Sequence, residues 1–150
     1  MKLILVALDD SPNAKQIFDG ARELAERTGA KLLLAHVVTI PIGLPAEAWA
    51  IEPMAIEKLL IANAERTLDQ LGAQLPPERF AGRRVVVGVP WRSICDLAKS
   101  ESVDLVAIGS HGYHGLDRVL GTTAAKVVNH ADRSVLVIRA LELLDELLEK

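Results

Sequence analysis

The chain has 150 residues, of which 50% are apolar and 25% are charged, and its formal net charge is −3. This size and mixture predict one globular domain with a full core and exclude a disordered protein. Aromatic residues make up only 3%, and 17 basic residues stand against 20 acidic ones, so we expect no nucleic acid partner.

The single cysteine and the lengths of the apolar runs indicate where in the cell the protein is located. Cys95 is the only cysteine, so an intrachain disulfide is excluded, which agrees with a reducing cytoplasm. Its neighbours predict a small residue in the core of a helix. The apolar run at residues 3–8 is too short for a secretory or membrane segment, and no other uncharged apolar run approaches the length of a membrane helix. We therefore expect a soluble, cytoplasmic protein with no membrane partner.

The first predicted unit is a strand, a tight turn and a helix. Residues 3–8 form a continuous apolar run closed by Asp9 and Asp10, as in a strand buried on both faces. Ser11 and Pro12 predict a helix start, and Gly29 predicts its end.

The same alternation continues along the chain. A strand at 31–38 is followed by an irregular crossover at 39–53 and a helix that ends near Gly72. Further strands are predicted at 84–87, 104–109 and 134–138, and further helices at 91–99 and 122–129. Alternating strands and helices predict an α/β fold, with a parallel sheet covered by helices on both faces. We assign residues 1–140 to this single domain.

Residues 141–150 form a different segment. Five leucines recur at spacings of three and four, and four acids with Lys150 give the segment the whole net charge of −3. This pattern predicts an acidic amphipathic helical tail. Two interpretations remain open: the tail docks on its own domain, or it packs on a protein partner.

Glycines gather between the predicted strand at 104–109 and the helix at 122–129. Four of the ten glycines lie there, and Thr122 and Thr123 follow them: Gly109, Gly112, Gly115 and Gly121. Glycines permit close backbone approach, and the amide groups of a helix N-terminus favour anions. The stretch therefore predicts a phosphate site, against the alternative of a flexible connector.

Two known phosphate-binding patterns do not fit. The P-loop pattern needs a lysine before the hydroxyl residue, and Gly121 precedes Thr122 directly. The dinucleotide pattern needs glycines after the first strand, where Asp9 and Asp10 stand. If the chain winds outward from the first strand in both directions, Asp9 lies opposite Gly109 and could hold ribose hydroxyls or a cation. Capping of the following helix is the competing interpretation for both acids.

Other candidate chemistries are weak. His111, His114 and Asp117 suggest a metal site, but the loop is rich in glycine and a fourth ligand is lacking, so no metal-ligating residues are assigned. His36 and His130 are interpreted as solvated or helix-terminal residues. No strained nucleophile motif occurs, so we assign no catalytic residues.

Five segments together resemble the universal stress protein family over residues 1–139. They are 4–9 (ILVALD), 35–37 (AHV), 88–90 (GVP), 104–112 (DLVAIGSHG) and 134–139 (SVLVIR). The resemblance implies a Rossmann-like three-layer sandwich with a five-stranded parallel sheet of strand order 3-2-1-4-5.

The resemblance also implies a nucleotide, usually ATP, with AMP or ADP as alternatives and with Mg²⁺ or Mn²⁺. It places adenine near Ala7, Leu8 and Val37, and ribose near Asp9 and Gly109. Phosphates are expected on four residues of the glycine-rich stretch: Gly112, Gly121, Thr122 and Thr123. Between Gly112 and Gly121 stand eight residues, one fewer than in the family's ATP-binding pattern, so the phosphate contacts are the less secure part.

The resemblance implies a homodimer through the last strand, Ser134 to Ile138, whose edge would otherwise be unpaired. The expected function is that of a nucleotide-binding sensor or regulator in the stress response, with slow or no hydrolysis. Two alternatives remain: an ATP-cleaving or adenylyl-transferring enzyme, and a dimeric scaffold without nucleotide. A phosphoryl-receiver domain is disfavoured, because no acceptor aspartate follows the strand at 84–87.

Overall fold

The computed structural model describes residues 1–40, 45, 47, 53–110 and 120–139. Strands and helices alternate along the chain as predicted. In order they are β1 (Leu3–Leu8), α1 (Ala14–Thr28), β2 (Lys31–Val38), α3 (Pro53–Gly72), the 3₁₀ turn η1 (Pro77–Arg79), β3 (Phe80–Val87), α4 (Pro90–Ser100), β4 (Leu105–Gly109), α5 (Thr122–His130) and β5 (Ser134–Ile138). No helix within these residues is long and apolar enough to cross a membrane.

The five strands form one parallel sheet in the order β3-β2-β1-β4-β5. The predicted α/β class, the Rossmann-like sandwich and the strand order are therefore confirmed. β1 lies at the centre of the sheet and pairs with β2 from Leu3 to Leu8 and with β4 from Ile4 to Ala7. The connections leave β1 toward both edges of the sheet, which makes the β1–β4 border a topological switch point.

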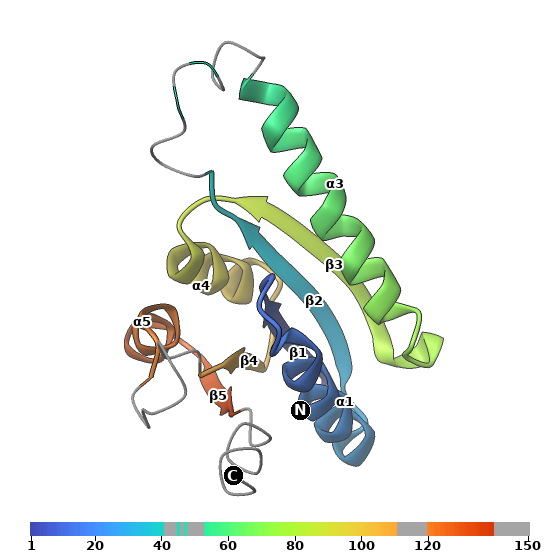
Figure 1. The fold of residues 1–150 in the computed structure, drawn as a ribbon. Coiled ribbons are helices and arrows are strands. Elements are labelled where there is room, and N and C mark those ends of the chain that lie inside the picture. Colours follow the sequence, from blue (N-terminus) through green and yellow to red (C-terminus); the bar gives the residue numbers. More distant parts are fainter. Residues whose placement is uncertain (41–44, 46, 48–52, 111–119, 140–150) are drawn as a thin grey trace, which may run out of the picture.

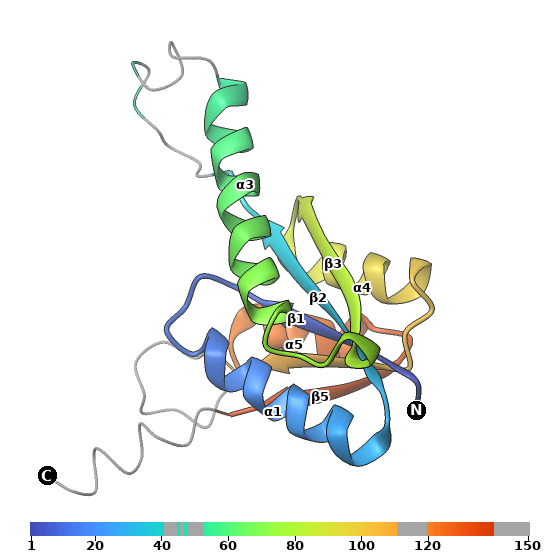
Figure 2. The same cartoon turned by 90° about the vertical axis from the view of Figure 1, so that its right-hand side faces the viewer.

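Helices cover both faces of the sheet. Figure 1 shows α1 and α3 on one side and α4 and α5 on the other, and the turned view in Figure 2 agrees. Each face has its own apolar cluster: one contains Phe18 of α1 and Leu68 of α3, and the other contains Ile94 of α4 and Val127 of α5. The middle strands are buried on both faces, which explains their continuous apolar sequences.

Two element boundaries differ from the prediction by more than one residue. α1 begins at Ala14 after Asn13, and not at Pro12. The reason is a turn in which the Asp9 Oδ1 accepts a hydrogen bond from the Ser11 backbone nitrogen at 3.0 Å, so the chain turns once before the helix starts.

β3 begins at Phe80, earlier than the predicted residue 84. Gly82 has a φ of 115°, and the pairing register with β2 shifts between Leu32 and Leu33. Glycine inside a strand commonly marks such an irregularity. Because Gly82 interrupts the apolar pattern, that pattern did not predict the first half of β3.

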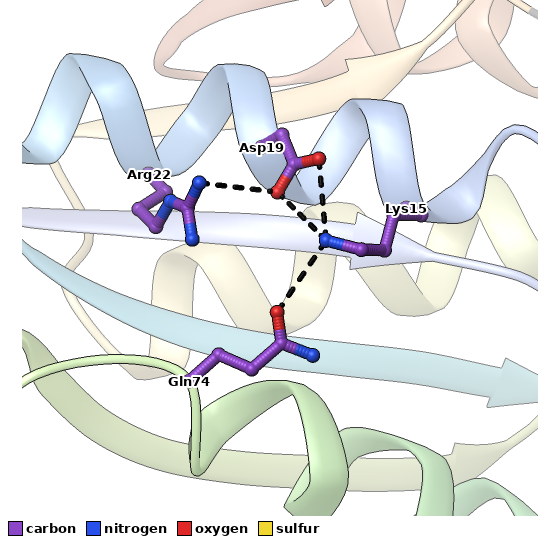
Figure 3. Close-up of polar contacts among 4 residues, drawn as sticks. All are labelled: Lys15, Asp19, Arg22 and Gln74. Carbon is purple, nitrogen blue, oxygen red and sulfur yellow. Dashed lines mark hydrogen bonds and ion pairs between the residues drawn. The ribbon is translucent and has the colours of Figure 1, made fainter.

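Polar contacts on the surface add a link between α1 and the turn after α3. Figure 3 shows Lys15, whose Nζ lies 3.1 Å from the Asp19 Oδ1 and 3.4 Å from the Gln74 Oε1. Arg22 lies 3.6 Å from the same Asp19 oxygen. These side chains are largely exposed, and exposed ion pairs stabilise a fold by about 0–1 kcal/mol. The buried apolar cluster, not this network, therefore holds α1 on the sheet.

Asp104 connects the starts of β1 and β4. Its Oδ2 accepts hydrogen bonds from the backbone nitrogens of Lys2 at 2.7 Å and Leu3 at 2.9 Å. These bonds favour the ionised carboxylate: first the one from Leu3 and then the one from Lys2 lower the pKa of Asp104 below its ordinary value of 3.8.

The two hydrogen bonds to the Asp104 carboxylate predict a pH-dependent contribution to the stability of the fold. Because the pKa of Asp104 is lower in the folded chain, its stabilising effect is full above the unfolded pKa and is lost as the pH falls through the folded pKa. Asp104→Asn should lower the melting temperature at pH 7, and the difference from wild type should shrink below about pH 4. Melting curves measured across pH test this prediction. Asp96→Asn, at an exposed position on α4, is the control. If Asp104→Asn lowered the melting temperature by the same amount at every pH, the stabilising role assigned to the ionised Asp104 carboxylate would be wrong.

Candidate functional site

A cavity of about 600 Å³ lies at the carboxyl edge of the sheet. It is bordered by the ends of β1, β2 and β4 and by the helices α3, α4 and α5. Its described lining consists of Ala7, Leu8, Asp9, Asp10, Ala35, His36, Val37, Val38, Thr39, Leu60, Asn63, Ala64, Pro90, Ile94, Ile108, Gly109, Thr122, Thr123 and Ala124. Open α/β sheets bind ligands at this edge, beside the switch point. Its size is typical of a small-molecule site, about 300–1,000 Å³.

Asp9 and Asp10 enter the cavity directly after β1. The N-cap residue of α1 is Asn13 and no side chain caps it, so helix capping, the competing interpretation, is not confirmed; Asp9 instead accepts the Ser11 hydrogen bond in the turn ahead of α1. It nevertheless lines the cavity. The Asp10 side chain is 87% exposed and also lines it. The turn at Asp9 and a place in the cavity are therefore compatible at this strand end.

Gly109 ends β4 and is buried at the cavity wall. Its neighbour Ser110 donates a backbone hydrogen bond to the Ile138 oxygen at 3.1 Å, and Gly121 donates one to the Ser110 oxygen at 3.4 Å. These bonds bring the start of α5 against the end of β4. The two segments are eleven residues apart in the sequence, from Ser110 to Gly121.

The start of α5 faces the cavity. Gly121 is the N-cap residue and does not itself line the cavity, whereas Thr122 and Thr123, in the first turn, do. The first turn of α5 contains no acidic side chain. The amide groups of a helix N-terminus and the two hydroxyl groups form a neutral, hydrogen-bonding wall that favours an anion.

Another part of the cavity wall is apolar. Ala7, Leu8 and Val37, expected near adenine, all line the cavity together with Ala35 and Ile108. No aromatic side chain occurs in the described lining. Trp91, half-buried on α4, instead packs its ring against His130, with 4.6 Å between the ring centroids. A flat ligand would therefore be held between aliphatic groups and backbone.

The charge of the described lining is negative. It contains Asp9 and Asp10 but neither lysine nor arginine. An anionic group therefore depends on the N-terminus of α5 or on a bound cation. Carboxylate oxygens are the ligands that Mg²⁺ and Mn²⁺ prefer, so the two aspartates are suited to such a cation.

His36 does not match its prediction. It was expected to be solvated, but the residue is only 8% exposed and lines the cavity at the end of β2. The reason is tertiary: β2 is an inner strand, and α3 packs over it. His130, in contrast, is exposed at the end of α5, where its Nδ1 lies 2.8 Å from the Lys126 oxygen.

Cys95 does not take part in the cavity. It is half-buried on α4, against the apolar cluster that contains Ile94, as its sequence neighbours predict. Burial raises the pKa of its thiol, and the charges of Asp96 and Asp132 raise it further. The thiol is therefore protonated at neutral pH and a poor nucleophile.

Several predicted residues lie outside the described residues. Gly112, one of the expected phosphate contacts, is among them, as are His111, His114 and Asp117. Within the described ranges, no group of three or more His, Cys, Asp or Glu residues is arranged to hold a metal ion.

The whole arrangement corresponds to a known family. A model of the Universal stress protein family matches residues 1–139. The chain belongs to the universal stress protein family. It is 31% identical over 140 residues to Universal stress protein A homolog 1 of Coxiella burnetii, covering 91% of this chain and 95% of that protein.

Solved structures of the family share the fold. A universal stress protein in complex with cAMP gives a TM-score of 0.61 at 24% identity, covering 92% of this chain and 96% of that chain. The universal stress protein from Archaeoglobus fulgidus in complex with dAMP gives a TM-score of 0.56 at 21% identity, covering 92% and 98%.

In this universal stress protein, the part of the cavity wall that α3 and α4 supply was not predicted from the sequence. Leu60, Asn63 and Ala64 come from α3, and Pro90 and Ile94 come from the start of α4. Their spacing along each helix is typical of an ordinary core-facing stripe. Only the packing of α3 and α4 beside the strand ends separates the residues that line the cavity from those that fill the core.

Proposed function

We propose that this universal stress protein binds an adenine nucleotide, ATP above all, in the cavity at the carboxyl edge of β1, β2 and β4. The observation that carries the proposal is the meeting of Asp9, Gly109, Thr122 and Thr123 in one cavity of about 600 Å³. Family members crystallised with cAMP and with dAMP support an adenine nucleotide as the ligand class.

The wall chemistry orients the ligand. The phosphates belong at the first turn of α5, where the amide groups of the helix N-terminus and the hydroxyls of Thr122 and Thr123 favour an anion. The carboxylates of Asp9 and Asp10 repel phosphate and accept hydrogen bonds from ribose hydroxyls. The aliphatic wall at Ala7 receives the base. A divalent cation, when bound, neutralises phosphate charge near the aspartates.

We infer a sensing or regulatory role with slow or no hydrolysis. His36 is the only histidine of the described lining, and it follows the alternation of β2 onto the α3 side, away from Thr122. A phosphate-release assay compares ATP turnover with and without protein. Turnover far above the protein-free rate would favour the ATP-cleaving enzyme instead.

Titration calorimetry with ATP, ADP and AMP, each with and without Mg²⁺, tests the central proposal. Saturable binding with one site per chain is the expected result. An absence of binding at high micromolar nucleotide would favour the scaffold without nucleotide. Mass spectrometry of nucleotide released from the denatured, purified protein adds an independent identification.

We further propose a homodimer through the edge strand β5. Within the described residues β5 pairs on one side only, with β4, and its Leu136 is 37% exposed. An exposed strand edge with an apolar side chain favours pairing with a second copy. Residues 141–150 remain a proposed second contact for a partner chain.

The dimer yields a direct prediction. Leu136→Asp places a charge on the proposed interface and should convert a dimer into a monomer. Light scattering coupled to size exclusion measures the mass. Val128→Asp, at a position on α5 that is 44% exposed, is the matched control and should leave the mass unchanged. A wild-type monomer at micromolar concentration would contradict the proposal.

A further inference from the structure

Three basic side chains gather around one indole ring on α4 and α5, which pack side by side on one face of the sheet (Figure 1). The Arg92 guanidinium lies 5.2 Å from the Trp91 ring centroid, and the Lys126 Nζ lies 5.9 Å from it. The centroid of the His130 ring lies 4.6 Å from the same indole. We call these four residues the Trp91 patch. None of them belongs to the described lining of the cavity.

The cations of the Trp91 patch lack a counter-charge within the described part of the chain. Arg92, Lys126 and His130 are all exposed, and none of them forms an ion pair with a described residue. The two helices together carry two lysines and one arginine against a single acid, Asp96. Contact with the face of an indole also limits the freedom of these side chains. The patch is therefore prepared to meet an acidic partner.

The chain itself contains a segment of matching chemistry. Residues 141–150 contain five leucines, four acids and one lysine. In the helix that their spacing predicts, the leucines share one side and the acids share the other. The Trp91 indole and the Cys95 side chain, one turn further along α4, are half-buried and offer apolar surface to the leucines. Arg92 and Lys126 offer positive charge to the acids beside them.

The proposed dimer brings this segment to the Trp91 patch of the second copy. Two identical strand edges related by a two-fold axis form one continuous sheet only when they run antiparallel, so the end of β5 in one copy lies beside the start of β5 in the other. Residues 131–133 alone separate that start, Ser134, from His130 at the end of α5. The steps from Ser134 back to His130 span at most about 13 Å, and a ten-residue helix is about 15 Å long, so residues 141–150 are long enough to cover the patch.

We propose that residues 141–150 of each copy dock on the Trp91 patch of the other copy. This inference rests on the proposed dimer through β5, and it names the surface that the second contact uses. Because the interface is the same on both copies, the contact occurs twice in each dimer. The surplus of negative charge in residues 141–150 then meets the unpaired cations of α4 and α5.

Zero-length carbodiimide cross-linking of the full chain, followed by mass spectrometry, tests the contact. An amide between the Lys126 Nζ and a carboxylate of residues 141–150 is the expected product, in a covalent dimer of twice the chain's mass. Lys126→Arg keeps the charge but removes the reactive amine, so this product should disappear. Lys58, exposed on α3 at the other face of the sheet, is the matched control and should form no such link. A Lys126 link found only within single chains would overturn docking on the second copy.

A charge-reversal series measures the same contact without a reagent. Lys126→Glu should raise the dissociation constant of the dimer about tenfold, because two contacts are lost at once. Replacing the four acids of residues 141–150 by glutamine should also weaken the dimer, and Lys126→Glu should then have no further effect. Lys58→Glu should leave the dimer unchanged. Sedimentation velocity over a dilution series gives each constant.

The outcomes separate this contact from the dimer itself. If the wild-type protein is a dimer but Lys126→Glu dissociates at the wild-type concentration, the Trp91 patch is not the docking surface, and the β5 interface stands. If the effect of Lys126→Glu is the same with and without the four acids, the partner of Lys126 is not this segment, and the inference is wrong. A wild-type monomer at micromolar concentration would overturn both the dimer and the docking.

Discussion

Thr122→Asp is expected to weaken ATP binding about a hundredfold without destabilising the fold. Thr122 is exposed in the first turn of α5, at the proposed phosphate wall. An aspartate there interacts favourably with the helix dipole and should add about 0.3–1 kcal/mol to the free energy of unfolding. The same charge repels a phosphate a few ångström away by about 3 kcal/mol, which corresponds to the hundredfold loss.

Calorimetry with ATP and adenosine, together with thermal melting, separates the two effects. Adenosine lacks phosphate, so its affinity should change little in Thr122→Asp. Thr122→Asn is the matched control, because it is similar in size and uncharged. If Thr122→Asn lost as much ATP affinity as Thr122→Asp, the cause would be shape and not charge. If Thr122→Asp bound ATP with unchanged affinity, the proposal that the phosphates lie at the N-terminus of α5 would be wrong.

Phe18→Ala is expected to cost about 3–5 kcal/mol of unfolding free energy. Phe18 is fully buried on the sheet-facing side of α1, in the cluster that includes Ile4, Leu34 and Leu68. Truncating the ring leaves a cavity between α1 and the sheet that the packed neighbours cannot fill. Since small domains are stable by only about 5–15 kcal/mol, this loss is a large part of the total.

Urea denaturation of both proteins measures the difference. Phe80→Ala is the comparison, because Phe80 packs against the same cluster but is only half-buried, and its loss should be smaller. A Phe18→Ala loss below about 1 kcal/mol would mean that α1 does not depend on this contact.

Lys15→Ala, which removes the exposed contacts to Asp19 and Gln74 shown in Figure 3, should change the stability by no more than about 1 kcal/mol.

Most of the fold was predictable because its signals are local. The buried strand β1 shows as an unbroken apolar run, and β5 was predicted at the residues where it lies. The start of β3 was missed, because Gly82 breaks the pattern by which a strand is recognised. The start of α1 shifted to Ala14, because the Asp9 side chain holds a turn ahead of the helix. Both differences arise where a side chain or a glycine alters the backbone within a few residues.

The candidate site was predictable in part. Glycine and hydroxyl residues between a strand and a helix pointed to Gly109, Thr122 and Thr123, and the structure brings these three to one cavity. The α3 contribution was not predictable, since Leu60, Asn63 and Ala64 follow the same periodicity as core residues. Gly112 lies outside the described residues, and its role stays a prediction.

His36 shows most clearly what each level decides. The sequence alone determined the α/β fold, its alternating elements and the sheet edge at which the cavity lies, because these follow from hydrophobic periodicity and from residues adjacent in the chain. It could not decide whether the side chain of a histidine at a strand end is exposed to solvent or lines a cavity. That depends on α3, which packs on β2 and places Asn63 in the same cavity wall, 27 positions along the chain. Burial is a property of the assembled layers, so only the tertiary structure shows that His36 is a buried residue that lines the cavity.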